Sequence, residues 1–398
     1  MLQPEILAKE QAITPILRLA FRPLFLLPAL FSILAVLVWV SVLHGQFNWF
    51  GLLPANIWHG HEMIFGFAAT VAVGFLLSAA QTWTGIRSIN GWKLAIIVIF
   101  WLIARIAFSS NSAPVLIIGA VSEGLWWLFA ISYLAYMVVK SNNRRNLIFI
   151  PLLSVIMVLD IATLLTAFVG NYSLSSHLAY CAVFMITCVV TIVGGRVIPF
   201  FTSRALNLPA IKGNIFLERL IIAAMVATLI SFLTSYYLPI PLILAVILTG
   251  TGCLQLVRMA NWQTAKTVKT PLLWSLHLAY LNMGIGFITL GLSYVTSDIS
   301  FSSAVHIITI GTIGTMIIAM MSRVSLGHTG RALQINTWIS FSFLLLLSAT
   351  LFRVILPVLG WYTAGYVLAA CCWGVGFAIY FIYYSPMLLT ARPDGRSG

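Results

Sequence analysis

The chain has 398 residues, of which 61% are hydrophobic and only 7% are charged, and its formal net charge is +13. A water-soluble protein of this length needs far more charged surface, so the composition excludes a soluble domain and indicates an integral membrane protein. The positive charge is divided among short separate segments, which excludes a nucleic-acid-binding patch.

Twelve apolar segments are each close to the roughly 20 residues that a helix needs to cross a bilayer. In chain order they are 24–43, 58–80, 92–108, 114–139, 147–169, 177–199, 215–235, 239–258, 272–295, 302–322, 336–356 and 361–385. The connecting loops are short. The sequence therefore predicts an all-α, polytopic protein with 12 transmembrane helices, whose residues 1–398 form a single membrane domain.

All but two of the 21 Lys and Arg residues fall on one side of these helices if both termini are cytoplasmic. The residues on that side are Lys9, Arg18, Arg22, Arg87, Lys93, Lys140, Arg144, Arg145, Arg196, Arg204, Lys212, Arg219, Arg258, Lys266, Lys269, Arg323, Arg331, Arg392 and Arg396. Because positively charged loops stay on the cytoplasmic side, we predict cytoplasmic N- and C-termini. The two exceptions, Arg105 and Arg353, lie near the outer ends of the third and eleventh helices.

The second and tenth predicted helices share a histidine, a glycine and a Thr-Gly pair at identical spacing. These residues are His61, Gly66 and Thr84-Gly85 in the second helix and His306, Gly311 and Thr329-Gly330 in the tenth. In each case the next helix carries one of the two outer arginines. We therefore predict three pseudo-repeats of four helices, over approximately 14–139, 147–258 and 270–385, of which the middle one is the most degenerate.

Histidines gather at the outer ends of these helices. His59 and His61 belong to the run Trp-His-Gly-His-Glu-Met at 58–63, and His306 lies at a matching depth. In a helix His59 and His61 point about 200° apart, so they serve different centres unless the backbone there is not helical. Imidazole is a common ligand of haem iron and copper. The alternative is that these histidines bind lipid headgroups at the interface.

The two outer arginines suggest what the histidines bind. Arg105 and Arg353 oppose the positive-inside pattern, and the adjacent outer loops offer them almost no acidic partner. Haem propionates are carboxylates, which arginine binds bidentately, although headgroup phosphates are alternative partners. We predict a non-covalent, b-type haem between the second and tenth helices. His59 or His61 and His306 would be its axial ligands, and Arg105 and Arg353 would bind its propionates.

A second group of polar residues lies towards the inner side. His277 is within the ninth helix and His328 is in a predicted loop after the tenth, so a second metal centre and a structural loop are both open interpretations. The Gly-Gly-Arg run at 194–196 suggests a glycine-permitted turn at the inner end of the sixth helix. Glu218 and Arg219 resemble an ordinary interfacial ion pair.

Three carboxyl groups are candidates for a proton path. Glu123 and Asp160 lie near mid-membrane by residue count, and Glu62 follows His61 directly. Carboxyl groups at that depth either serve a proton path or hydrogen-bond a neighbouring helix, and the sequence does not decide between these roles.

The chain resembles the NnrS family, bacterial twelve-helix membrane proteins that are linked to nitric oxide metabolism and described as containing haem and copper. The resemblance covers nearly the whole chain. Its motifs are Ala-Phe-Arg-Pro-Leu-Phe-Leu at 20–26, Trp-His-Gly-His-Glu-Met at 58–63, Gly-Gly-Arg-Val-Ile-Pro-Phe-Phe-Thr at 194–202 and Met-Met-Ser-Arg-Val-Ser-Leu-Gly-His-Thr-Gly-Arg at 320–331. The resemblance implies a location in the inner membrane, with haem and copper as candidate cofactors.

A fainter likeness connects the chain to the haem-copper oxidase and nitric oxide reductase superfamily. The pattern His-x-x-x-Met-Ile-Phe from His59 to Phe65 is similar to that superfamily's second helix. The chain departs from it in two places: its tenth helix has one histidine rather than His-x-His, and its seventh helix has no paired histidines for copper. These departures put a haem-copper active site of the usual kind in doubt.

Three functions remain open at this stage. The first is capture or processing of nitric oxide at a membrane-embedded haem, with a quinol or an electron-donor protein as partner if nitric oxide is also reduced. The second is a twelve-helix secondary transporter for a metal, haem or a small anion. The third is a non-catalytic membrane protein that protects or assembles iron or haem proteins. Whether the protein is an enzyme is therefore left open.

Overall fold

The computed structural model describes residues 11–396, so Lys9 of the positive-inside pattern lies outside the described residues. Within this range the chain is helical and contains no β-strand. The predicted all-α class is confirmed.

Each predicted membrane segment corresponds to one helix or to one continuous helical run. The bounds are α2 (Phe21–Leu43), α3 (Ala55–His61) continuing through η2 (Glu62–Ala69) into α4 (Thr70–Thr84), α5 (Gly91–Ala107), α6 (Ala113–Lys140), α7 (Phe149–Phe168), α8 (Tyr172–Ala205), α9 (Ile215–Ser235), α10 (Pro241–Ala260), α11 (Pro271–Leu292), α12 (Phe301–His306) continuing through η5 (Ile307–Gly314) into α13 (Thr315–His328), α14 (Thr337–Val358) and α15 (Tyr362–Leu389). Over residues 11–396, eleven of these runs are long and apolar enough to cross a membrane, and the twelfth, α5, has 17 residues. The protein is therefore a multi-pass membrane protein.

Two helices extend further than hydropathy predicts. α8 continues through Gly194 and Gly195 to Ala205, so the turn predicted there is wrong. α13 includes His328 as its last residue, whereas the sequence pattern places that histidine in a loop. Both extensions contain arginine and glycine. These residues end the apolar run from which the helix is predicted, although the backbone remains helical.

The second and tenth membrane runs contain matching π-helical segments. η2 begins directly after His61 and η5 directly after His306, and each has 8 residues. In both runs a threonine that follows the segment hydrogen-bonds the carbonyl five residues before it, Thr70 to Phe65 at 3.0 Å and Thr315 to Ile310 at 3.3 Å. π-helical turns are rare and occur frequently at functional sites. The threefold repeat itself stays a prediction.

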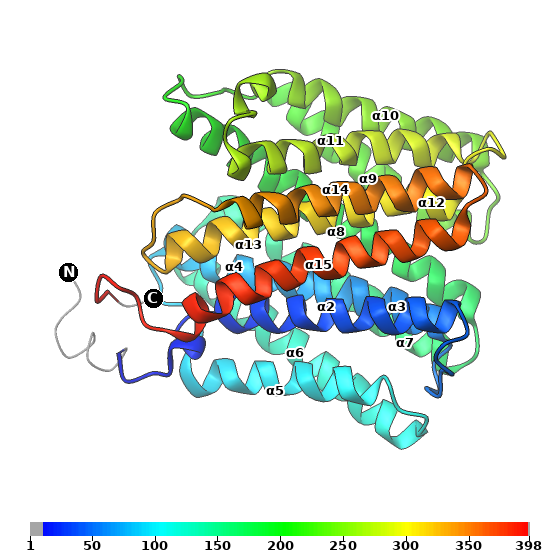
Figure 1. Ribbon diagram of the computed structural model, residues 1–398, viewed down its shortest axis with the longest axis horizontal. Helices are drawn as coiled ribbons and strands as arrows, with labels where there is room; N and C mark the ends of the chain where they lie inside the picture. The colour runs from blue at the N-terminus through cyan, green and yellow to red at the C-terminus, as the bar shows by residue number, and fades with distance from the viewer. Residues whose placement is uncertain (1–10, 397–398) are drawn as a thin grey trace. The chain divides into compact units, whose positions relative to one another are not determined.

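The described residues form two compact units. Unit 1 contains 11–179, 321–334 and 377–396, and unit 2 contains 180–320 and 335–376. In unit 1, α5 lies beside α6 (Figure 1), and α2 packs against η2 and α4. In unit 2, α11 packs against α10 and η5, and η5 also packs against α14.

The arginine of the Phe-Arg-Pro motif has a structural role in unit 1. Arg22 is fully buried, and its Nη1 donates to the carbonyl oxygens of Leu388 and Thr390 at 2.7 and 2.8 Å. The last carbonyls of a helix have no partner within the helix, and a cation there also interacts favourably with the helix dipole. Arg22 therefore caps the end of α15.

Candidate functional site

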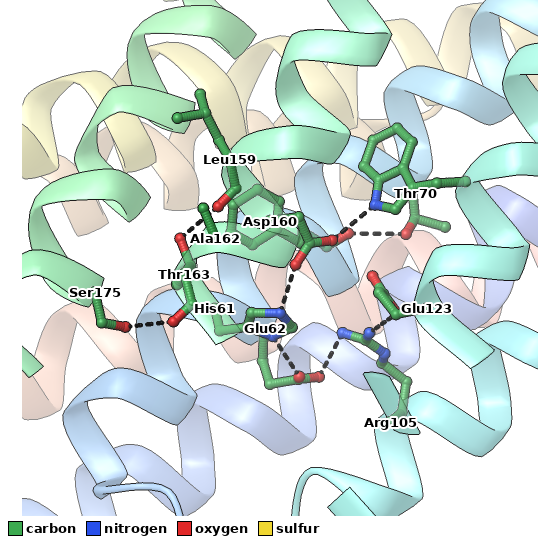
Figure 2. Close-up of polar contacts among 12 residues, drawn as sticks. His61, Glu62, Thr70, Arg105, Glu123, Leu159, Asp160, Ala162, Thr163 and Ser175 are labelled. Carbon is green, nitrogen blue, oxygen red and sulfur yellow. Dashed lines mark hydrogen bonds and ion pairs between the residues drawn. The ribbon is translucent and has the colours of Figure 1, made fainter. Parts of the chain in front are cut away.

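A network of charged side chains lies inside unit 1. It contains His61 and Glu62, where α3 meets η2, together with Arg105 of α5, Glu123 of α6 and Asp160 of α7 (Figure 2). Each residue has an exposed fraction of 4% or less. Charged groups inside a membrane protein are costly unless they are paired, so a five-membered cluster at this depth is a functional candidate.

His61 lies between two carboxyl groups. Its Nδ1 is 3.0 Å from Oε1 of Glu62, and its Nε2 is 2.8 Å from Oδ1 of Asp160. A neutral imidazole has only one N–H, and an ionised carboxylate can only accept. Either both ring nitrogens carry hydrogen, or one of the two carboxyl groups is protonated and donates. The trio Glu62–His61–Asp160 therefore holds at least one proton more than a neutral imidazole between two carboxylates.

Arg105 joins the trio to a third carboxyl group. Its Nη1 donates to Oε2 of Glu62 at 2.8 Å, and its Nη2 donates to Oε2 of Glu123. The guanidinium reaches these partners by passing over Gly66, where a Cβ would lie 2.2 Å from Nη1. The absence of a side chain on Gly66 is therefore what lets α5 place its arginine beside η2.

Two tryptophans complete the network from α5 and α6. Trp127 donates through Nε1 to Oδ2 of Asp160 at 2.7 Å. Trp101 donates through Nε1 to the carbonyl oxygen of Gly66 and to Oγ1 of Thr70, both at 3.0 Å. The π-helical segment alters the local hydrogen bonding of the backbone, and the Gly66 carbonyl accepts the indole N–H. The indoles thus fix the carboxyl group of Asp160 and the backbone at Gly66.

Replacing Gly66 by Ala is expected to destabilise the protein by roughly 1–3 kcal/mol, because the new methyl group overpacks the site. The clashing atom is the end of a flexible side chain, but Arg105 cannot move without breaking its pairs with Glu62 and Glu123. Gly60 is the matched control, since a Cβ there meets nothing within 4 Å. Thermal unfolding of the purified protein measures both variants, and equal stability of G66A and G60A would contradict the close approach.

The other outer residues have contacts of their own. His59 stacks on Trp39 with ring centroids 4.7 Å apart. In unit 2, Nδ1 of His306 is 2.6 Å from the carbonyl oxygen of Ser302, and Nη2 of Arg353 donates to Oγ of the same serine at 2.8 Å. His306 and Arg353 therefore meet at Ser302.

The inner histidines have separate surroundings. His277 is fully buried, with Oγ1 of Thr202 and of Thr264 each 2.9 Å from one ring nitrogen. His328 packs against Phe21 with ring centroids 5.5 Å apart. Over residues 11–396, no three His, Cys, Asp or Glu side chains are grouped so that they could hold a metal ion. The second metal centre therefore stays a prediction.

Unit 2 contains a polar network that the sequence pattern does not indicate. Arg258 of α10 donates to both carboxyl oxygens of Glu218, so the predicted pairing of Glu218 with Arg219 is replaced by a partner on the neighbouring helix. Arg258 also donates to the carbonyl oxygen of Thr191 at 2.8 Å and to the hydroxyl of Tyr280 at 2.9 Å.

The two histidine–arginine pairs differ in how well they suit a haem. Both ring nitrogens of His61 are held by carboxyl groups, and Arg105 already faces Glu62 and Glu123. This arrangement does not fit an iron ligand or a partner for a propionate. The outer loops offer Arg105 almost no acidic partner, whereas the membrane helices supply Glu62 and Glu123.

His306 and Arg353 do fit. Because a carbonyl only accepts, the Ser302 contact places the hydrogen of a neutral His306 on Nδ1 and the lone pair on Nε2. Histidines that bind metals commonly donate their other N–H to a backbone carbonyl in this way. Nη1 of Arg353 is buried and has no hydrogen-bond partner among the described residues. A buried guanidinium nitrogen of this kind is suited to bind an anionic group. Joint ligation by histidines of the second and tenth helices stays a prediction.

The family model described as NnrS protein matches residues 15–392, nearly the whole chain. No curated protein matches the chain.

Proposed function

Because the chain belongs to the NnrS family, which gives it a role related to nitric oxide, we propose that it is a haem protein of the bacterial inner membrane that captures nitric oxide. Both termini would face the cytoplasm, as the positive-inside pattern predicts. Copper is the second candidate metal, and metal analysis of the purified protein distinguishes the two. A quinol or an electron-donor protein would be the partner if captured nitric oxide is also reduced.

One observation carries this proposal: His306 and Arg353 meet at Ser302. His306 would hold the iron through Nε2, and Arg353 would bind a propionate through Nη1. A bound ferrous haem would supply the coordination position for nitric oxide. The chain's own part is to fix the imidazole through the Ser302 carbonyl and to offer a cation to the carboxylate. Nitric oxide is small and apolar and concentrates in lipid, so a site within the bilayer suits its capture.

Replacing His306 by Ala is expected to abolish the Soret band of the purified protein and its shift with nitric oxide, because the iron would lose its imidazole ligand. Replacing Arg353 by Gln is expected to leave the band in place but to weaken haem retention, because the propionate would lose one charge-assisted hydrogen bond. His44→Ala is the matched control, because Nδ1 of His44 makes the same contact with the carbonyl four residues before it, Val40 O at 2.8 Å, and His44 is not one of the proposed ligands. Absorption spectra and haem content measure all three.

A Soret band that survives in H306A with unchanged haem content would refute this ligand assignment. A purified protein that contains neither haem nor copper would favour the alternative, a secondary transporter. One feature of the structure supports that alternative, because buried His–Asp–Glu networks occur in pumps and transporters as proton relays. If the purified protein has no absorption band of its own, a rise in its unfolding temperature on addition of a metal, haem or a small anion would then identify the class of cargo.

A further inference from the structure

We propose that the buried network of unit 1 is a proton-loading site, which exchanges one proton with water, and that Glu123 is the carboxyl group that gains and loses it. This inference concerns residues other than His306 and Arg353 and does not rest on a bound haem.

The charges of the network do not balance without protons. Glu62, Glu123 and Asp160 supply three carboxyl groups, whereas the cationic partners are one guanidinium and one imidazole. With every carboxyl ionised and His61 protonated, the network carries a net charge of −1. An uncompensated buried charge is strongly disfavoured, so the network is expected to be neutral. Neutrality requires one further proton, on a carboxyl group.

The hydrogen bonds identify that carboxyl group. Both oxygens of Glu62 have partners, in His61 and Arg105, and both oxygens of Asp160 have partners, in His61 and Trp127. Glu123 pairs with Arg105 through Oε2 only, and its Oε1 is buried with no partner among the described residues. A proton added to Glu62 or Asp160 binds an oxygen that already accepts a hydrogen bond. Oε1 of Glu123 accepts none from the described residues, so it can take a proton without any change in the hydrogen bonds of the network.

The surroundings of Glu123 suit a proton that arrives through water. Two buried donors also lack a partner among the described residues. One is Nε of Arg105, whose guanidinium binds Glu123. The other is Nε1 of Trp126, which lies about one helical turn further along α6 than Glu123. Unsatisfied buried polar atoms of this kind are the partners that internal water molecules usually take. A water among them could deliver the proton to Oε1.

The proposed step is a simple proton transfer. A hydronium ion gives its proton to Oε1 of Glu123, an O–H bond forms, and the charge of the carboxyl group changes from −1 to 0 while no electron moves. Arg105 keeps its pair with Glu62 throughout. The other Lys and Arg residues of the helices around the site lie at helix ends, because Arg22 is near the start of α2, Lys93 near the start of α5 and Lys140 at the end of α6, and α4 has no charged residue.

Infrared difference spectra between acidic and alkaline samples of the full-length protein in lipid vesicles test this proposal. We expect the carbonyl band of one protonated carboxyl group to appear on acidification and to disappear in E123Q. The matched control is D298N, which removes an exposed loop carboxyl group and should keep the band. If E123Q does not fold, E123D should shift the frequency of the band rather than remove it.

Two results would overturn the proposal. The first is a wild-type protein without any such band across the range in which the protein stays folded, which would make the network a fixed set of ion pairs. The second is a band that E123Q leaves unchanged, which would place the proton elsewhere. Haem content, measured on the same samples, keeps these outcomes separate from a failure of the proposed function.

Discussion

Replacing Arg105 by Gln is expected to lower the free energy of unfolding by about 3–5 kcal/mol, the effect usually seen when one partner of a buried ion pair is removed. Glu62 and Glu123 would remain buried with no cation between them, since the guanidinium of Arg105 bridges their Oε2 atoms. Thermal or denaturant unfolding of the protein in detergent measures the loss. Infrared spectra of R105Q should also show an additional protonated carboxyl group, because neutralising one glutamate removes part of the penalty.

Arg353 provides the control for Arg105. It lies in α14 as Arg105 lies in α5, but its side chain contacts Oγ of Ser302 and the ring of Tyr366, whose centroid is 4.3 Å away. R353Q should therefore cost only about 1 kcal/mol, the net value of one hydrogen bond. The double variant R105Q/E123Q should recover part of the stability that R105Q loses. If R105Q and R353Q destabilise equally, the carboxyl partners of Arg105 contribute nothing measurable.

The membrane helices could be predicted closely because each is a long apolar run with short polar loops on either side. The span predicted at 215–235 has the same limits as α9. The helix ends are predicted wrongly where the backbone stays helical although the residues are no longer apolar. At the inner ends of α8 and α13 the chain stays helical through glycines and arginines, and hydropathy carries no information about the backbone there.

The candidate site could be predicted as a list of residues but not as a set of contacts. Glu62, Glu123, Asp160 and Arg105 stand out because ionisable residues are rare in membrane helices. Their pairing depends on which helices are neighbours, and periodicity within one helix does not contain that information. The sequence therefore indicates no acidic partner for Arg105, although Glu62 on η2 and Glu123 on α6 both pair with it.

The two matching π-helical segments each follow a histidine, but the surroundings of the two histidines differ. The residue after His61 is Glu62, whereas the residue after His306 is Ile307, so only the first segment supplies a carboxyl group to its arginine. Arg105 is therefore neutralised by Glu62 and Glu123, whereas Nη1 of Arg353 has no hydrogen-bond partner among the described residues. The difference between Glu62 and Ile307 thus accounts for the different surroundings of the two arginines.

Unit 2 uses a glycine in the same way as unit 1. Gly195 of α8 lies against the guanidinium of Arg258, where a Cβ would come within 1.9 Å of Nη2 and 2.1 Å of Cζ. The guanidinium cannot rotate away freely, because it donates hydrogen bonds to Glu218, Thr191 and Tyr280. The Gly-Gly-Arg run at 194–196 therefore serves helix packing at Gly195, and not the turn that the sequence suggests.

Replacing Gly195 by Ala is accordingly expected to destabilise the protein by roughly 3 kcal/mol, at the upper end of the usual cost of overpacking, because the methyl group displaces a guanidinium that is 6% exposed and bidentately paired. Gly250 is the control, since a Cβ there meets nothing within 4 Å. The double variant G195A/R258M tests the cause: removing the guanidinium relieves the clash, so G195A should cost much less in the R258M background than in the wild type. An equal cost in both backgrounds would show that Gly195 is needed for a reason other than its contact with Arg258.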